Sequence, residues 1–279
     1  MDIRAPGKLV KVSDTKMHVY SKPSTLKQDN STIVFLAGSG TACPTYDFKP
    51  LWHLLTDNYN IVIVERPGYG WSGQTNCPRD IDTILEETRE ALKQAGIASP
   101  FIPAAHSLSG LEAIYWAQKY PEEISAIIGL DMAVPQCYES MELPQFFGLQ
   151  AKLLHLLRGS ISRSMVKNHT AVKNNLLDEK EQAAMRSIIS KQLLSQNMID
   201  EIEYVKENAR KVAKGKCPVI PLLCFLSDDK GILKSMPTWG KVHREYFEAN
   251  DQAQFIQLHC DHYVHNEAPQ DIADAISGL

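Results

Sequence analysis

The sequence predicts an α/β protein built on a mostly parallel sheet that is flanked by helices. Short runs of β-branched and aromatic residues alternate with longer amphipathic segments between residues 32 and 130. Such alternation requires parallel strands joined by helices on both faces of the sheet. A helical stretch then interrupts the pattern, and two further strand-like runs follow it. At 279 residues, the chain has room for one large α/β unit with an insertion.

The first two strands are predicted to pair antiparallel. Apolar and polar residues alternate over 7–12 and 16–20, on either side of the turn-forming residues 13–15. Alternation with period two on both sides of a short polar turn is typical of a β-hairpin. This hairpin is the antiparallel part of the predicted sheet.

The next region supplies parallel strands and the helices between them. Strand-like runs occupy 32–36, 61–64, 101–104 and 126–130. Amphipathic segments lie between them, at 48–56, 80–95 and 109–120. Gly96 is placed to cap the second of these helices, and Pro121 ends the third.

A helical insertion follows the sixth strand. From Pro135 to about Gly215 every periodic segment is helical and rich in Leu, Lys, Gln and Glu. Asp178 and Glu181 form a capping-box pattern at the start of one of these helices. An insertion between two strands lies over the carboxyl edge of the sheet, where its inner face lines a pocket. We therefore predict a helical cap over residues 135–216.

The sheet resumes after the cap. Strand-like residues occupy 219–226 and 254–258, and a last helix begins near Pro269. Residues 1–134 and 217–279 thus form the predicted core, with eight strands in all. Within the cap, the apolar run 146–158 is either a helix buried against the sheet or a lipid-facing lid, which would favour longer acyl chains.

Composition narrows the class of protein. Hydrophobic residues make up 44% and charged residues 22%, which is ordinary for a globular protein. The net charge is −4 and no basic patch stands out, so we expect no nucleic-acid binding. We expect no membrane binding and no secretion signal, because no apolar run is long enough for either. The six scattered cysteines indicate free thiols and a cytoplasmic protein; the oligomeric state stays open.

One serine lies in a pattern that carries chemistry. An apolar run leads into Ala105-His106-Ser107-Leu108-Ser109, and a helix-like stretch follows. This small-x-Ser-x-small pattern is typical of a nucleophile elbow, in which a strand turns sharply into a helix and exposes the serine hydroxyl. Ala105 and Ser109 are small enough for that turn, and Gly110 lets the helix pack closely. Ser107 is therefore the candidate nucleophile.

Two other segments supply what an activated serine needs. The strand-like run 32–36 ends in a glycine-rich loop, 37–41, whose backbone N–H groups are free to face a developing oxyanion. Downstream, His262 follows a late strand, and Pro269 begins the helix after it. A histidine in that position is able to reach the elbow as a general base.

With these motifs the chain resembles the α/β-hydrolase superfamily, specifically capped serine hydrolases of the esterase and peptidase type. The likeness covers roughly residues 8–134 and 217–279, and Ser before His is the chain order of that family. The segment 65–72, Glu-Arg-Pro-Gly-Tyr-Gly-Trp-Ser, is similar to the family's Asp-x-x-Gly-x-Gly-x-Ser loop. Residues 262–269 are similar to its Gly-His-x-x-x-x-Glu-x-Pro ending, with Asp261 in place of Gly.

The oxyanion loop departs from the family pattern. The family commonly has His-Gly there, whereas this chain has Ala37-Gly38. Because the loop contributes a backbone N–H, the change is compatible with activity. The resemblance implies that the N–H groups of Ser39 and Leu108 are the oxyanion donors. A serine nucleophile also argues against haloalkane dehalogenases and epoxide hydrolases, which the family builds around Asp.

The third member of the triad has several candidates. The family places it after the seventh strand or, more rarely, after the sixth. The usual position after the seventh strand falls on Lys230, and Asp228 and Asp229 come slightly before it. Asp131 directly follows the strand at 126–130 and is our first choice, with Asp229 and Asp228 as alternatives. Each of the three could instead serve only as a cap or a surface turn residue.

The histidines near the carboxyl terminus allow a different interpretation. His259, His262 and His265 are spaced three apart, with Cys260 and Asp261 between them, which could suggest zinc. A strand followed by a loop does not bring three imidazoles together as one helical face would. We therefore predict no metal and no organic cofactor. His106 is expected to pack or hydrogen-bond near the elbow.

The resemblance implies an enzyme that cleaves small carboxylic esters or amides through an acyl-enzyme intermediate. Two alternatives use the same residues. An aminopeptidase of the proline-iminopeptidase type would need a carboxylate of the cap near the serine, such as Glu139 or Glu142. A non-catalytic protein that binds a small ligand in the capped cavity would need no turnover at all.

Overall fold

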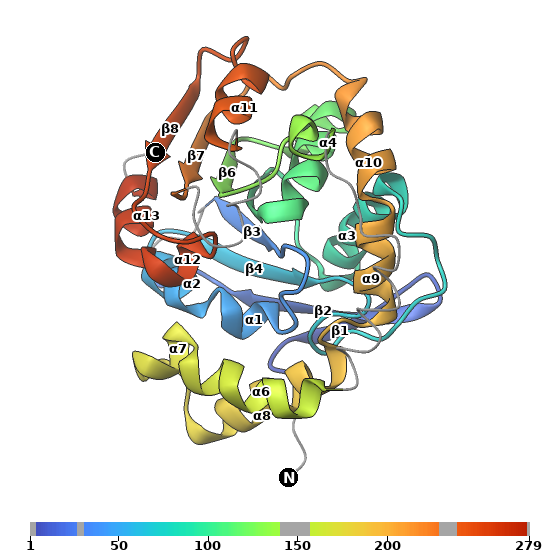
Figure 1. Cartoon of the computed structure of the whole chain (residues 1–279), viewed down its shortest axis with the longest axis vertical. Helices are drawn as coiled ribbons and strands as arrows, with labels where there is room; N and C mark the ends of the chain where they lie inside the picture. The colour runs from blue at the N-terminus through green and yellow to red at the C-terminus, as the bar shows by residue number, and fades with distance from the viewer. Residues whose placement is uncertain (1–3, 27–30, 140–156, 229–238, 278–279) are drawn as a thin grey trace.

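An eight-stranded sheet forms the centre of the protein (Figure 1). The computed structural model describes residues 4–26, 31–139, 157–228 and 239–277. The strands are β1 (Lys8–Val12), β2 (Thr15–Lys22), β3 (Thr32–Leu36), β4 (Asn60–Glu65), β5 (Phe101–His106), β6 (Ile127–Leu130), β7 (Leu222–Leu226) and β8 (Ala253–Gln257). Only β2 runs antiparallel to its neighbours, β1 and β4. The predicted fold class, a mostly parallel eight-stranded sheet, is confirmed.

The strand order brings three loops to one place. The order is β1-β2-β4-β3-β5-β6-β7-β8, so β3, β5 and β6 are consecutive neighbours in the middle of the sheet. All three are parallel, and their carboxyl ends therefore meet at the same edge. The glycine-rich loop, Ser107 and Asp131 directly follow these three strands. This edge is where open α/β sheets bind their ligands.

Helices cover both faces of the sheet. On one face lie α3 (Ile81–Ala95), α4 (Gly110–Lys119) and α11 (Trp239–Tyr246), and on the other lie α1 (Pro44–Asp47), α2 (Lys49–Leu55), α12 (Val264–Glu267) and α13 (Pro269–Ile276). Successive residues of β3 enter opposite cores: Val34 and Leu36 pack on the first face, Ile33 and Phe35 on the second. A central strand that is buried on both faces explains the continuous apolar run in the sequence.

The seventh strand is shorter than predicted. The sequence favours a strand over 219–226, but β7 begins only at Leu222. Pro218 and Pro221 flank the first residues of the predicted run, and a proline has no N–H to donate to a central ladder. Pro221 contributes only its carbonyl, which accepts from the Ile127 amide at 2.9 Å.

All the regular elements that the structure describes between β6 and β7 are helical, and loops connect them. It contains the short 3₁₀ turn η3 (Pro135–Tyr138) and the helices α6 (Arg158–Asn168), α7 (Thr170–Lys173), α8 (Glu179–Gln192), α9 (Gln196–Glu203) and α10 (Val205–Ala213). The predicted capping box of α8 is confirmed, since Asp178 and Glu181 each accept from the other's amide, at 2.8 and 3.0 Å. Except for its last two residues, the apolar run 146–158 lies outside the described residues.

These inserted helices form two groups (Figure 1). Helices α6, α7 and α8 lie beside α1, and α7 contacts α2 and α12. Helices α9 and α10 lie on the side of α3, and α10 packs on α4. That residues 135–216 form a separate cap over the serine stays a prediction.

Two further observations bear on the composition. All six cysteines are free thiols. Across the described segments, no helix has both the length and the apolar character that crossing a bilayer requires.

Candidate active site

The elbow at the end of β5 has the backbone of a sharp strand-to-helix turn. Ser107 has a φ of 53°, in the left-handed region that a residue with a Cβ rarely adopts. Holding a non-glycine residue there costs on the order of 1–3 kcal/mol, so the surrounding contacts must enforce it. Ser109 contributes to this, because its Oγ lies 2.7 Å from the Leu36 carbonyl and 2.8 Å from the His106 carbonyl. The turn thus presents the Ser107 hydroxyl at the carboxyl edge of the sheet.

The residue after the elbow must be glycine. A Cβ on Gly110 would lie 2.2 Å from the backbone carbonyl oxygen of Ala133. The same loop is tied to the elbow by a hydrogen bond of 2.7 Å from the Ala133 amide to the Ser107 carbonyl. The segment that carries Asp131 is therefore fixed directly to the turn that carries Ser107.

His262 links the serine to a buried carboxylate. Its Nε2 lies 2.8 Å from Ser107 Oγ, and its Nδ1 lies 2.6 Å from Asp131 Oδ2. The loop between β8 and α12 holds the imidazole, which is 6% exposed. With the proton on Nδ1, the ring donates to Asp131, and Nε2 accepts from the serine hydroxyl. In the sequence, His262 is separated from Asp131 by 131 positions and from Ser107 by 155 positions.

Four hydrogen bonds hold Asp131 in its buried position. Its Oδ1 accepts from the Ser227 amide at 3.0 Å and from Trp239 Nε1 at 2.9 Å. Its Oδ2 accepts from Ser227 Oγ at 2.6 Å in addition to His262. Burial raises the pKa of Asp131, but the hydrogen bonds from His262 and Ser227 outweigh it and lower the pKa below its ordinary value. The carboxylate is therefore negatively charged at neutral pH.

The sequence reasoning missed Ser227 and Trp239. Ser227 follows β7, the strand beside β6, so the topology could have placed it next to Asp131. Trp239 begins α11, and nothing in its local sequence marks it as a partner of a buried acid.

Asp228, one of the two alternative acids, has other partners in the structure. Asp228 Oδ1 lies 3.3 Å from Nδ1 of the exposed His259, at the surface. Its amide donates to the carbonyl of Cys260 at 3.0 Å. Asp229 lies outside the described residues. Of Asp131 and Asp228, the structure brings Asp131 to His262.

The glycine-rich loop passes against the serine. A Cβ on Gly38 would lie 2.8 Å from Ser107 Cβ and 2.8 Å from His106 Nδ1, so no larger residue fits there. The two candidate oxyanion donors are the next residues in the chain after this contact: Ser39 follows Gly38, and Leu108 follows Ser107.

Gly38 therefore offers a test of the loop that leaves the triad side chains unchanged. We expect Gly38→Ala to lower kcat by about 10²–10³, the cost of losing one oxyanion donor, because the new methyl group displaces the loop from Ser107. Gly40→Ala is the matched control, since a Cβ at position 40 meets no atom within 4 Å and only its φ of 82° is strained. Steady-state ester hydrolysis by the two variants measures the difference. Equal losses in both would contradict a close approach of residue 38.

The three closely spaced histidines have three different carboxylate partners. His262 contacts Asp131, and the exposed His259 contacts Asp228. His265 is buried, and its Nε2 lies 2.7 Å from Asp47 Oδ2. The described residues contain no group of His, Cys, Asp and Glu side chains that could hold a metal ion.

His106 packs beside the site. Its ring centroid lies 4.8 Å from that of His262 and 4.7 Å from that of His265. Its Nε2 lies 3.1 Å from the His262 carbonyl, which orients the loop behind the general-base candidate. Burial and the neighbouring imidazoles hold the pKa of His106 well below the ordinary value for histidine. The ring is therefore neutral at pH 7.

A cavity of about 240 Å³ lies beside the glycine-rich loop. Its wall joins Gly40 and Thr41 of this loop to Tyr263, the residue after His262, and to Met165 and Met185 of the inserted helices. Asp47, His169 and Asn266 form its polar side. The cavity therefore lies between the sheet edge and the segment predicted to be the cap.

Asp47 connects the core to this cavity wall. Its Oδ1 lies 3.0 Å from His169 Nε2, and its Oδ2 lies 2.7 Å from His265 Nε2. Burial raises the pKa of Asp47, but the hydrogen bonds from these two histidines outweigh it and hold the pKa far below the ordinary value.

This shift makes a prediction for stability against pH. A carboxyl group whose pKa is lower in the folded state stabilises the fold above its unfolded pKa, and this contribution is lost as the pH falls. We expect Asp47→Asn to lower the free energy of unfolding by about 1–3 kcal/mol at pH 7. The difference from the wild type should shrink below about pH 4, near the ordinary pKa of Asp. Urea unfolding at pH 7, 5 and 3.5 measures it. If the difference in unfolding free energy between the wild type and Asp47→Asn grew as the pH fell, it would contradict a lowered pKa of Asp47.

Of the two carboxylates in the aminopeptidase interpretation, the structure describes only Glu139. Glu139 is exposed and lines a separate pocket of about 140 Å³ with Lys206 and Arg210. Glu142 lies outside the described residues.

Comparisons with known proteins agree with this architecture. The uncharacterized protein YbdG of Bacillus subtilis (strain 168) is 37% identical over 278 residues, which cover 97% of this chain and 84% of that protein. Cfl2 from Burkholderia cenocepacia matches in structure with a TM-score of 0.71 at 19% identity, over 97% of this chain and 94% of its own. The enol-lactonase from Burkholderia xenovorans LB400 matches with a TM-score of 0.70 at 14% identity, over 97% and 98%.

The family is shown by a match at the level of sequence. A model of the alpha/beta hydrolase family matches residues 33–275, which include every strand from β4 to β8 and nearly all of β3. The matched span also contains Ser107, Asp131 and His262. The chain therefore belongs to the alpha/beta hydrolase family, which places it among hydrolytic enzymes.

Proposed function

We propose that this protein is a serine hydrolase that cleaves small carboxylic esters or amides through an acyl-enzyme intermediate. The observation that carries the proposal is the hydrogen-bonded series from Ser107 Oγ through His262 to Asp131, at distances of 2.8 and 2.6 Å. The strained φ of 53° at Ser107 supports it, because such strain is retained where a hydroxyl must be presented.

In the proposed acylation, Ser107 Oγ attacks the substrate carbonyl carbon while His262 Nε2 takes the hydroxyl proton. The carbonyl oxygen becomes an oxyanion, and the C–O or C–N bond of the leaving group breaks as His262 returns the proton to it. Asp131 orients the imidazole and stabilises the imidazolium that forms. Its negative charge suits this role, because the hydrogen bonds from His262 and Ser227 outweigh the effect of burial and lower its pKa.

Deacylation follows the same route with water as the nucleophile. His262 takes a proton from water, which attacks the acyl carbon, and the proton then passes to Ser107 Oγ as the carboxylic acid leaves. In both steps the amides of Ser39 and Leu108 donate to the oxyanion. The approach of Gly38 to Ser107 supports this assignment, because the loop that carries the Ser39 amide passes directly against the serine.

Residues 135–216 act as the cap in this proposal. The cavity beside Gly40 receives part of the substrate, since the loop after β3 and α6 and α8 of the cap form its wall together. Its volume of about 240 Å³ favours a small substrate group. No cofactor or metal takes part in the proposed reaction.

A fluorophosphonate probe tests the proposal against a non-catalytic binder. The probe forms a covalent bond only with a serine that is activated as a nucleophile. We expect the wild type to be labelled at Ser107 and Ser107→Ala to remain unlabelled. A panel of p-nitrophenyl esters of graded chain length and aminoacyl anilides then identifies the substrate class. Absence of both labelling and turnover in the folded wild type would overturn the proposal in favour of the binder, and preference for the anilides would favour the aminopeptidase.

A further inference from the structure

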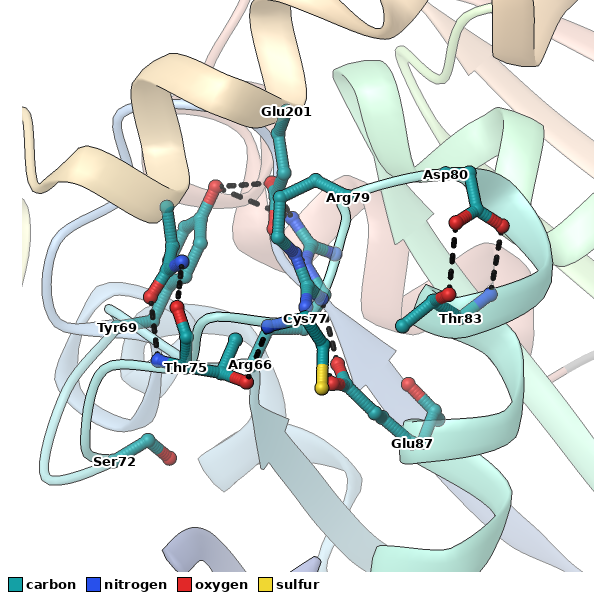
Figure 2. A network of polar contacts seen from close by, with 12 residues as sticks. Arg66, Tyr69, Ser72, Thr75, Cys77, Arg79, Asp80, Thr83, Glu87 and Glu201 are labelled. Carbon is teal, nitrogen blue, oxygen red and sulfur yellow. Dashed lines mark hydrogen bonds and ion pairs between the residues drawn. The ribbon is translucent and has the colours of Figure 1, made fainter. Parts of the chain in front are cut away.

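A buried cluster of charged side chains lies outside the proposed triad (Figure 2). The cluster joins two arginines to three glutamates and one tyrosine, each at most 3% exposed: Arg66, Arg79, Glu87, Glu112, Glu201 and Tyr69. Arg66 and Tyr69 belong to the loop after β4, Glu112 to α4, and Glu201 to α9 of the proposed cap. The cluster therefore connects the sheet edge, the helix after the elbow and the inserted helices.

Arg66 is the centre of this cluster. Its Nε and Nη2 donate to the two carboxylate oxygens of Glu201 at 3.1 and 3.0 Å, in a bidentate pair. Its Nη1 donates to Glu112 Oε2 at 3.1 Å. Tyr69 donates its hydroxyl to Glu201 Oε2 at 2.6 Å, which fixes the carboxylate from a second side, as Figure 2 shows. One planar guanidinium thus holds α4 and α9 in fixed relation.

Arg66 also contacts the loop proposed to bind the oxyanion. Its Nη2 donates to the carbonyl of Ala37 at 2.8 Å. The carbonyl of Ala37 and the amide of Gly38 belong to one planar peptide group. The hydrogen bond from Arg66 therefore fixes the orientation of this group, which precedes the Ser39 amide in the loop. Gly38 is the residue whose approach to Ser107 leaves no room for a side chain.

Stability alone gives a poor account of this arrangement. Replacing a buried ion pair by well-packed apolar residues is often neutral or stabilising, whereas removing one partner is costly. The cluster here has one more carboxylate than guanidinium, and burial raises the pKa of Glu112 and of Glu87 despite their arginine partners. What the charged groups provide, and apolar residues would not, is directional bonds to a backbone carbonyl.

We propose that Arg66, held by Glu201 of α9, is a positioning residue that sets the oxyanion loop through the carbonyl of Ala37. The inference rests on the proposed function. It means that the placement of α9 is transmitted to the reacting centre by one side chain, so that the inserted helices influence the rate of the reaction as well as the shape of the cavity.

The cluster contains its own matched control. Arg79 is fully buried and pairs with Glu87 through two hydrogen bonds of 3.1 and 2.6 Å. Its Nε lies 3.9 Å from Glu201 Oε1, so it shares the same electrostatic environment. The hydrogen bonds of its side chain go to Glu87 rather than to the loop after β3. If the cluster had only a structural role, substitutions of Arg66 and of Arg79 would have the same effect on catalysis.

The test compares Arg66→Lys with Arg79→Lys in the full chain. Kinetics with p-nitrophenyl acetate, inhibition by a phenylboronic acid and the melting temperature are measured for each variant. The boronic acid forms a tetrahedral adduct with the serine, and one of its oxygens occupies the oxyanion site. We expect Arg66→Lys to lower kcat and boronate affinity by about 10–100-fold each, with KM changed by less than about 3-fold. Arg79→Lys should leave kcat and boronate affinity within about 2-fold, whatever its melting temperature.

A second pair of variants covers the case in which Arg66→Lys does not fold. Glu201→Gln keeps the shape of the side chain and an acceptor for Tyr69, but loses one bond to Arg66, so we expect a smaller loss of kcat and boronate affinity in parallel. Glu87→Gln is its control. Equal losses in the Arg66 and Arg79 variants, or unchanged boronate affinity after either Arg66→Lys or Glu201→Gln, would overturn the inference while leaving the proposed function intact. A wild type that neither hydrolyses the ester nor reacts with the fluorophosphonate would overturn both.

Discussion

Ser107→Ala should abolish ester hydrolysis, with a fall in kcat of about 10⁵–10⁶. The magnitude follows from triad enzymes, in which removing the nucleophile costs about as much as removing the whole triad. Residual catalysis over the uncatalysed reaction comes from the oxyanion donors and from substrate binding. The substitution removes only Oγ, whose described contact is with His262, so the fold is retained. Steady-state kinetics and a melting curve of the purified variant measure both effects. Turnover within tenfold of the wild type would contradict Ser107 as nucleophile.

The backbone at this position adds a second expectation. Ser107→Gly is equally inactive, but it relieves the strain of a φ of 53° that alanine retains. We expect the glycine variant to be more stable than the alanine variant by about 1 kcal/mol, at the lower end of the strain expected for such a residue. Urea unfolding of the two inactive variants gives the difference. A glycine variant that is the less stable of the two would show that the turn is not strained.

Asp131→Asn should lower kcat by about 10⁴ without unfolding the protein. Asparagine tolerates the left-handed φ of 49° at this position, and its Oδ1 is still able to accept from the Ser227 amide and Trp239. Its amide nitrogen would face His262 Nδ1 in place of the carboxylate oxygen. An N–H donor there favours the imidazole tautomer that carries its proton on Nε2, which is unable to accept the proton of Ser107. The negative charge that stabilises the imidazolium is lost as well.

The control for this prediction discriminates among the candidate acids. Asp228→Asn and Asp229→Asn should each leave kcat within about twofold of the wild type if Asp131, whose Oδ2 lies 2.6 Å from His262 Nδ1, is the acid of the triad. Kinetics of all three variants on one ester give the result. A large loss in either control, together with a small loss in Asp131→Asn, would transfer the role of the acid to that residue.

Much of the fold was predictable because it depends on local patterns. The buried strands read as continuous apolar runs, and the helices between them read as amphipathic segments with recognisable caps, such as the Asp178 capping box. The elbow was recognisable for the same reason, because the turn admits only small residues around Ser107. The start of β7 was predicted wrongly, because the prediction followed the apolar residues from 219 onward. The prolines at 218 and 221 have no N–H to pair with a neighbouring strand, and β7 begins after them.

The candidate site was only partly predictable, because its geometry joins distant parts of the chain. Three acids fit the sequence pattern, and strand order together with the loop after β6 brings Asp131 to His262. Its other donors, Ser227 and Trp239, come from the loop after β7 and from α11. Nothing in the segment 65–72 indicates that Arg66 reaches both Ala37 and Glu201.

The sequence by itself determined the α/β class, the eight strands, the insertion after the sixth strand and the turn at Ser107. Each of these follows from residues close together in the chain, whose side chains and backbone preferences act over a few positions. Only the tertiary structure decided which carboxylate faces His262 and which buried charges contact the loop beside the serine. Asp131 and His262 are 131 positions apart, and Arg66, which contacts Ala37, is held by Glu201 at a separation of 135 positions. Packing between such distant elements leaves no periodic signal in the sequence.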